Sequence, residues 1–289
     1  MSIFQQLFVL LQYVLPHHLL SYLMHQLART EWVWLKELLI NQIIKHYRVN
    51  MAEAANPNPK SYRSFNEFFT RQLAPNARPI AEAKNLICSP VDGAVSQFGE
   101  ICDGRIFQAK GHDYALQELI GGDAELSAQF EGGSFATIYL SPRDYHRIHM
   151  PLDGELRQMI HVPGRLFSVN ATTTEQVPRL FARNERIVSI FETEVGPVAV
   201  ILVGAIFVAS IDTIWAGAVA PNYRGVKRWN YGNKPHNVLL SKGAEMGRFN
   251  MGSTVILLFG KERITWDERL SPGLSLRMGE QIAALQKSE

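Results

Sequence analysis

Charged residues are absent from one end of this sequence, and cysteine is sparse throughout it. The first 28 residues contain no Asp, Glu, Lys or Arg. The only two cysteines, Cys88 and Cys102, form no C-x-x-C pair and belong to no Cys/His cluster with zinc spacing. We therefore expect two reduced thiols on the cytosolic side and no metal site, since a chain of 289 residues can build a core without disulfides.

The charge balance excludes a nucleic-acid-binding surface. Residues 1–50 carry four basic and two acidic side chains. Because the whole chain has 29 basic and 27 acidic residues, the remaining part is neutral, with 25 of each sign. No basic patch of the kind that binds nucleic acid is present. With 46% hydrophobic residues, the composition is typical of a folded protein with a sizeable core.

The N-terminal segment lacks an unbroken apolar run. A transmembrane helix needs about 20 mostly apolar residues, whereas Gln5, Gln6 and Gln12 interrupt this stretch and Pro16 breaks it. The segment also lacks the basic start of a secretory signal. Neither a membrane-spanning helix nor a secretory signal is therefore expected.

The same segment has helical periodicity instead. One face of the first helix would carry Ile3, Leu7, Leu10, Leu11 and Val14. Two further amphipathic stretches follow, one after Pro16 and one over residues 32–47, where Trp32 and Trp34 lie near basic residues. Such helices either lie in a membrane interface or pack on the protein's own core. The absence of charge favours the interface, so we expect residues 1–53 to form a helical membrane-association segment.

Residues 61–289 are predicted to form a β-rich catalytic domain. A linker composition at residues 54–60 precedes a short helix, whose S-F-N-E sequence at 64–67 fits a capping box. The apolar run Val198–Ile211 indicates a buried hairpin or two buried strands. The expected class is α+β, with N-terminal amphipathic helices followed by the β-rich body. Other candidate strands span residues 135–140, 156–162, 187–191 and 254–259.

The pair Gly252-Ser253 stands directly before the last of these strands, within M-G-S-T at 251–254. Alone, a Gly-Ser pair before a strand indicates only a turn. Its surroundings are more specific, and they include E-M-G-R-F at 245–249 and P-V-D-G at 90–93. Further motifs in order along the chain are S-Y-R-S-F-N-E-F-F at 61–69, S-P-R-D-Y-H-R-I-H-M-P at 141–151, H-V-P-G at 161–164, L-F-S-V-N at 166–170 and L-F-A-R-N-E-R at 180–186.

Together these motifs resemble the phosphatidylserine decarboxylase family, most closely its proteobacterial type. The family's self-cleavage motif is L-G-S-T, and Met251 replaces the leucine here, apolar for apolar. The resemblance implies cleavage between Gly252 and Ser253 into a large chain, residues 1–252, and a small chain, residues 253–289. The two chains are expected to stay associated, because the small chain opens with a strand.

Three residues could carry the cleavage. A serine hydroxyl needs a base, histidine is the usual base near neutral pH, and a carboxylate can fix its tautomer. Asp92, His149 and Ser253 could supply these roles. Ser253 would attack the carbonyl of Gly252, which has no side chain to hinder the approach. Otherwise, Asp92 before Gly93 is an ordinary turn residue, and either histidine of the motif could simply be packed or exposed.

The resemblance further implies that Ser253 becomes a covalent pyruvoyl group, the only cofactor expected. Decarboxylation of an amino acid needs an electron sink, and an imine between this group and the serine head group would provide it. His146 is the candidate proton donor. The product from phosphatidylserine would be phosphatidylethanolamine. The expected partners are phosphatidylserine and a lipid surface, with a homodimer as an open alternative, and the expected location is the cytoplasmic face of the inner membrane.

Three alternatives stay open at this stage. A lipid-acting serine hydrolase could use the same Asp92, His149 and Ser253, although the chain lacks a G-x-S-x-G elbow around Ser253. A non-catalytic membrane-binding protein would use all these residues structurally. A soluble pyruvoyl amino-acid decarboxylase is disfavoured by the charge-poor N-terminal helices. Cleavage of the chain separates the pyruvoyl enzymes from the other two classes.

Overall fold

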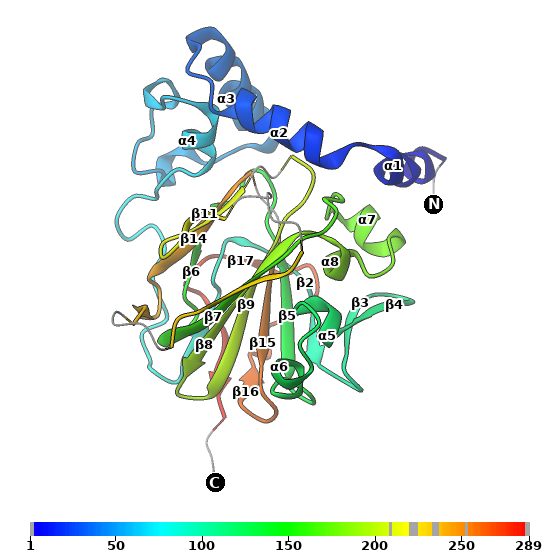
Figure 1. Cartoon of the computed structure of the whole chain (residues 1–289). Helices are drawn as coiled ribbons and strands as arrows, with labels where there is room; N and C mark the ends of the chain where they lie inside the picture. Colours follow the sequence, from blue (N-terminus) through cyan, green and yellow to red (C-terminus); the bar gives the residue numbers. More distant parts are fainter. Residues whose placement is uncertain (1–2, 208–209, 220–224, 233–236, 252–253, 287–289) are drawn as a thin grey trace.

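The computed structural model describes residues 3–207, 210–219, 225–232, 237–251 and 254–286 (Figure 1). Helices at the N-terminal end lie across one end of a β-rich body, and the C-terminal end of the chain lies at the opposite end. The predicted α+β class is confirmed. Gly252 and Ser253 lie outside the described residues.

Three amphipathic helices begin the chain, as predicted: α1 (Ile3–Val14), α2 (His17–Ala28) and α3 (Val33–Tyr47). The short helices η1 (Met51–Glu53), η2 (Pro59–Ser61) and α4 (Phe65–Phe69) follow. Ser64 caps α4 by accepting a hydrogen bond from the backbone N of Glu67 at 3.2 Å. The Glu67 carboxylate in turn accepts from the backbone N of Arg63, one residue earlier than in a standard capping box.

A large antiparallel sheet forms the centre of the body. Its strand order is β12-β7-β8-β9-β15-β5-β2-β17, with β13 pairing to β7 beside this path. Strand β15 lies inside the sheet, paired with β9 and β5 along its full length, and all six of its residues are buried. The strands are β2 (Gly93–Glu100), β5 (Ser134–Tyr139), β7 (Gly154–Val162), β8 (Arg186–Thr193), β9 (Gly196–Val203), β12 (Lys227–Asn230), β13 (Leu239–Leu240), β15 (Thr254–Phe259) and β17 (Ser275–Leu276).

Smaller sheets and short helices complete the body. A four-stranded sheet has the order β11-β10-β14-β6, a three-stranded one β1-β18-β16, and β3 pairs with β4. Their bounds are β1 (Leu86–Cys88), β3 (Arg105–Ala109), β4 (His112–Ala115), β6 (Arg147–His149), β10 (Ser210–Thr213), β11 (Gly217–Val219), β14 (Glu245–Asn250), β16 (Ile264–Trp266) and β18 (Gln281–Leu285). The helices are α5 (Leu116–Leu119), α6 (Ala124–Ala128), α7 (Ala171–Gln176) and α8 (Leu180–Arg183).

The apolar run Val198–Ile211 forms two strands rather than a hairpin. Strand β9 belongs to the large sheet and β10 to the four-stranded sheet, so the chain passes from one sheet to the other between them. Periodicity could not distinguish these cases, since strands buried on both faces are equally apolar in either arrangement. Cys88 is buried and Cys102 is exposed, and both are free.

Helices α1 and α2 dock on the body through polar contacts. The side-chain oxygen of Gln12 accepts from the backbone N of Ser168 at 2.9 Å, and Nε2 of His18 lies 3.0 Å from the carbonyl oxygen of Gly164. Phe167, from the L-F-S-V-N motif, is fully buried and packs edge-on against Tyr13 and His17. The contacts to the body are therefore made by the side of the helices opposite to their apolar stripe.

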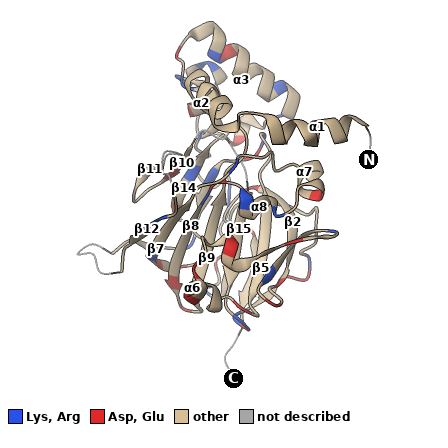
Figure 2. Ribbon diagram, turned by 45° about the vertical axis from the view of Figure 1, so that its right-hand side comes forward, with Lys and Arg blue, Asp and Glu red and all other residues tan. Residues whose placement is uncertain are grey.

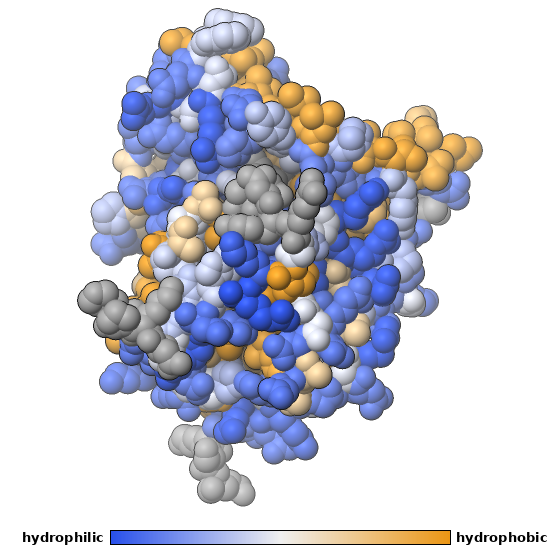
Figure 3. Space-filling model, in the orientation of Figure 1, coloured by the Kyte–Doolittle hydropathy of each residue, from blue (hydrophilic) through white to orange (hydrophobic). Residues whose placement is uncertain are grey.

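The apolar stripe itself faces solvent. Ile3, Phe4 and Val14 are 81%, 82% and 71% exposed. Neither α1 nor α2 contains a Lys, Arg, Asp or Glu (Figure 2), and their exposed edge forms a hydrophobic band (Figure 3). No described helix is by itself long and apolar enough to cross a membrane; α1 and α2 reach that length only together, with a bend of 91° between them. Exposed apolar side chains on the same segment include Leu7, Leu10, Leu11, Leu19, Leu23, Trp32, Val33, Trp34 and Leu38.

Candidate active site

The residues that flank Gly252 and Ser253 have distinct backbone conformations. Thr254 begins β15, is fully buried, and pairs with Tyr139 of β5 on one side and Val203 of β9 on the other. Met251 ends the preceding segment with a φ of 80°, a left-handed conformation that costs a non-glycine residue about 1–3 kcal/mol. The predicted cleavage site thus lies between a strained residue and a strand fixed inside the sheet.

Asn250 anchors the chain before this point. Its side-chain Nδ2 donates to Oγ of Ser210 at 2.7 Å and to Oδ1 of Asp212 at 2.8 Å. Its Oδ1 accepts from Nδ2 of Asn66, at the start of α4, at 3.0 Å. Because Asn250 is almost fully buried, these bonds fix the end of β14 two residues before Gly252.

Asp92 lies at the start of β2 and is buried, but its partner is an arginine. Nε and Nη2 of Arg78 donate to its two oxygens at 2.9 and 2.5 Å, and the backbone N of Met278 donates to Oδ1 at 2.8 Å. Arg78 also binds Glu53, at 2.7 Å. These carboxylates raise the pKa of Arg78 above its usual value. Arg78 therefore compensates the buried charge of Asp92 with a bidentate pair.

The glycine after Asp92 has a steric role. A Cβ at Gly93 would lie 2.5 Å from the carbonyl oxygen of Tyr139. Only glycine allows β2 to approach β5 this closely, which brings Asp92 to the end of the sheet where β15 begins.

His149, the last residue of β6, has both ring nitrogens engaged. Nδ1 lies 2.7 Å from the carbonyl oxygen of Gly243 and Nε2 lies 2.9 Å from the hydroxyl of Tyr145. A carbonyl only accepts, so Nδ1 carries a proton. Burial lowers the pKa of His149 by more than the Gly243 carbonyl raises it, which makes the ring neutral. Nε2 therefore has a free electron pair, which accepts the hydrogen bond from Tyr145.

The structure brings Asp92 and His149 into one region without bonding them to each other. The carbonyl of Gly243, rather than Asp92, fixes the tautomer of His149. Tyr145, which bonds to His149, lines a cavity of about 510 Å³ together with Asp92 and Tyr139. Five arginines also line this cavity: Arg48, Arg71, Arg78, Arg143 and Arg277. The triad of Asp92, His149 and Ser253 stays a prediction, because Ser253 lies outside the described residues.

His146 is the most deeply buried of the candidate residues. Its ring stacks on Phe69 at a centroid distance of 4.1 Å and an interplanar angle of 17°. Burial, with a contribution from the Arg71 guanidinium, lowers the pKa of His146 to about 3, against a smaller opposing contribution from the backbone of Ser141. Among described residues, neither ring nitrogen has a well-formed hydrogen bond. A neutral imidazole whose nitrogens lack a well-formed partner can take up or release a proton at a bound molecule.

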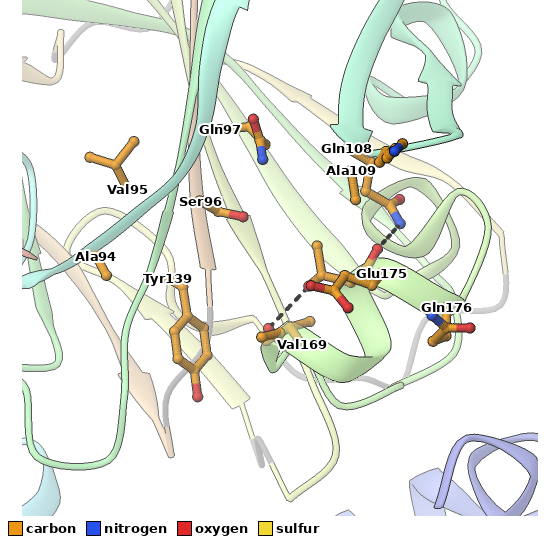
Figure 4. Close-up of a pocket in the computed structure, with 13 residues that line it drawn as sticks. Ala94, Val95, Ser96, Gln97, Gln108, Ala109, Tyr139, Val169, Glu175 and Gln176 are labelled. Carbon is orange, nitrogen blue, oxygen red and sulfur yellow. Dashed lines mark hydrogen bonds between the residues drawn. The ribbon is translucent and has the colours of Figure 1, made fainter. Parts of the chain in front are cut away.

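A second cavity of about 580 Å³ adjoins this region (Figure 4). It shares Ala94 and Tyr139 with the first one. Tyr139 and the start of β2 line one side, and Val169, Glu175 and Gln176 from the α7 segment line another. Since Tyr139 pairs with Thr254, both cavities lie at the end of the sheet where β15 begins.

Sequence reasoning missed Arg78 and Tyr145. Tyr145 stands inside the S-P-R-D-Y-H motif, four residues before His149, which was the available signal. Arg78 lies in a stretch with an ordinary loop composition, and no local sequence feature marks it as the partner of Asp92. His161, from the H-V-P-G motif, hydrogen-bonds Glu185 at 2.7 Å. Arg228 of β12 donates to the carbonyl oxygen of Gly121 at 2.9 Å.

Comparisons with known proteins identify relatives of this chain. The family model described as phosphatidylserine decarboxylase matches residues 65–284, and a second one, described as PSD, matches residues 7–48. Similar proteins named phosphatidylserine decarboxylase proenzyme occur in Azotobacter vinelandii (56% identity over 96% of this chain and 97% of the relative) and Saccharophagus degradans (57% over 97% and 98%). The relative of that name in Pseudomonas aeruginosa is 54% identical over the full length of both chains.

Proposed function

This chain belongs to the phosphatidylserine decarboxylase family, and we propose that it matures by cutting itself at Gly252-Ser253 and then decarboxylates phosphatidylserine to phosphatidylethanolamine. The observation that carries this proposal is the neutral, buried His149. It is hydrogen-bonded to Tyr145, which lines a cavity together with Tyr139, the partner of Thr254 in the sheet. The family's proenzyme names support maturation from a precursor.

In the self-cleavage step, His149 takes the hydroxyl proton of Ser253. The serine oxygen attacks the carbonyl carbon of Gly252, and the peptide bond is replaced by an ester. Elimination then releases Gly252 as a carboxylate and leaves dehydroalanine at position 253. That residue takes up one water and loses one ammonia, which leaves a pyruvoyl group. The strained Met251 and the fixed Thr254 hold the two sides of the bond while it breaks.

The surrounding residues suit a pyruvoyl group at position 253. Such a group supplies the electron sink that loss of a carboxylate requires. Thr254, whose amide would adjoin it, is held inside the sheet and excluded from water. His146 is the residue that we assign to proton transfer at the α-carbon of the substrate. Its ring nitrogens lack a well-formed partner among the described residues, which supports this assignment.

We place the lipid head group in the cavity of Figure 4. Ser96, Gln97 and Lys110 provide polar and basic groups there, which suit the carboxylate and the phosphate of a serine head group. The cavity includes α7, and α7 contacts α1, the helix with the exposed apolar stripe. A lipid held under α1 could therefore place its head group beside Tyr139.

The N-terminal helices support binding to a membrane surface. Their exposed apolar side chains and their lack of charge indicate that hydrophobic burial would drive this binding. We assign the protein to the cytoplasmic face of the inner membrane as a peripheral protein. A homodimer stays a prediction that a size measurement would test.

The intact mass of the denatured protein tests the proposal. We expect two chains, 1–252 and 253–289, with the small chain lighter by one ammonia than a peptide that begins with serine. Ser253→Ala should give one uncut chain with no release of carbon dioxide from phosphatidylserine. A wild-type chain that stays whole would favour the serine hydrolase or the non-catalytic membrane-binding protein, and hydrolysis of lipid esters by that uncut chain would favour the hydrolase.

A further inference from the structure

The ring of His146 is oriented mainly by packing. Catalytic histidines are usually oriented by a hydrogen bond to the second ring nitrogen. Here neither nitrogen of His146 has a well-formed bond to a described residue. The close contact that sets the plane of the ring is the stack on Phe69, at 4.1 Å and 17°. Phe69 is itself 4% exposed, so the pair is sealed from water.

The two residues after Phe69 hold the chain around His146. The carbonyl oxygen of Thr70 accepts from Nε of Arg147 at 2.9 Å. Nη2 of Arg71 donates to the carbonyl oxygen of Arg143 at 3.0 Å, while its guanidinium lies over the ring of Phe68. Residues 69–71 thus contact the side chain of His146, the backbone at Arg143 before it and the side chain of Arg147 after it.

Phe69 also belongs to a cluster that reaches the N-terminal helices. We name this the aromatic cluster: Ala28, Ile40, Val49, Tyr62, Phe65, Phe68 and Phe69. Ile40 of α3 is fully buried in it, and Met251, which directly precedes Gly252, packs against it. One continuous set of apolar contacts therefore joins α3, the candidate proton donor and the residue before the cleavage site.

We propose that Phe69 is the positioning residue for His146, and that the aromatic cluster makes α3 part of the active site as well as of the lipid-binding surface. This inference rests on the proposed function, since it assumes that His146 moves a proton during decarboxylation. It goes beyond a membrane anchor, because an anchor matters only for substrates in a membrane. Positioning of His146 matters for every substrate, including one dissolved in water.

Short-chain phosphatidylserine, kept below its micelle-forming concentration, separates the two roles. The test compares Phe69→Leu, which keeps an apolar side chain but removes the flat face, with Phe69→Tyr, which keeps the face. Phe130→Leu is the matched control, because Phe130 is fully buried in the main core. It lies just before the first residue of β5, at the end of that strand opposite to Tyr139. For each variant the fraction cut, kcat, KM and the pH dependence of kcat are measured, with thermal unfolding to compare stability.

We expect Phe69→Leu to lower kcat on the soluble lipid about tenfold or more, because a small misplacement of a catalytic group is costly. The KM of Phe69→Leu should change little. Phe69→Tyr should retain near-normal kcat. Phe130→Leu should lose stability without losing kcat. Equal kcat values for Phe69→Leu and Phe130→Leu would overturn the proposal. If the wild type itself releases no carbon dioxide, the proposed function fails instead, so the two failures are distinguishable.

A variant that does not fold is also informative. If Phe69→Leu is unstable, Ile40→Val loosens the same cluster by one methyl group from α3. We expect this variant to fold and to show a lower kcat on the soluble lipid. An unchanged kcat in Ile40→Val would refute the link between α3 and the site.

Discussion

The hydroxyl of Tyr145 lies 2.9 Å from Nε2 of His149, so the nitrogen that a general base would use already accepts a hydrogen bond. This bond stabilises the neutral form of the ring, and hydrogen bonding to a neutral form disfavours the charged form. Tyr145 should therefore keep the pKa of His149 low, in the same direction as its burial.

Self-cleavage should depend on pH through this pair. Because the pKa of His149 is lowered, the basic form persists below pH 6.5, and the rate should fall only at more acidic pH. Tyr145→Phe should move the acidic limb of the rate profile to higher pH. Cleavage of freshly translated protein, followed by mass at several pH values, measures this. Tyr114→Phe is the control, since Tyr114 is buried in the main core and should leave the profile unchanged.

Loss of Arg78 should destabilise the fold strongly. Removing one member of a buried ion pair leaves an uncompensated charge and costs about 3–5 kcal/mol. Arg78 and Asp92 are 6% and 9% exposed, so Arg78→Ala should fall in this range. The exposed Arg269, paired with Asp267, gives a matched control whose loss should change stability little. Urea unfolding of the uncut Ser253→Ala protein measures the free energy of unfolding for both variants. Equal losses of stability would contradict the claim that Arg78 compensates the buried charge of Asp92.

Burial of His146 should make stability fall in acid. The unfolded chain binds a proton near pH 6.5, whereas the folded chain does so only near pH 3, so the unfolded state gains the extra proton between these values. Stability from this residue is full above pH 6.5 and declines as pH falls, by about 1.4 kcal/mol per unit. In the Ser253→Ala background, His146→Gln should remove that slope. Parallel slopes in both proteins would show that His146 is not buried in neutral form.

The apolar stripe of α1 should drive vesicle binding. Burial of a leucine side chain contributes about 1.5–3 kcal/mol, so replacing two should weaken binding at least about tenfold. Leu7 and Leu10 are both exposed on α1, and their double replacement by serine is measured by flotation with vesicles. Leu239→Ser is the control, because Leu239 is equally exposed but lies on β13, away from the helices. Turnover of the soluble short-chain lipid should not change, and undiminished flotation would remove the interfacial role.

The sequence predicts what depends on local pattern. The helices over residues 3–47 and the strand that begins at Thr254 follow from apolar periodicity and length, and the structure confirms them. The partners of the site residues depend on contacts between distant segments. Arg78 meets Asp92 from the other side of strand β1, and Phe69 meets His146 from 77 positions away, so no periodicity encodes either contact. Even Tyr145, inside a recognised motif, has a role that only its distance to His149 shows.

The position of strand β15 affects whether unfolding of the mature enzyme can be reversed. Before the proposed cut, the protein is one chain, and its unfolding can reverse within a single molecule. After it, the segment that begins at position 253 carries the innermost strand, with six residues paired on both sides. Unfolding would then release a separate peptide, and recovery would require two pieces to meet again, at a rate set by their concentration. Each enzyme molecule is therefore folded once, as a precursor, and afterwards persists only for as long as its sheet stays closed.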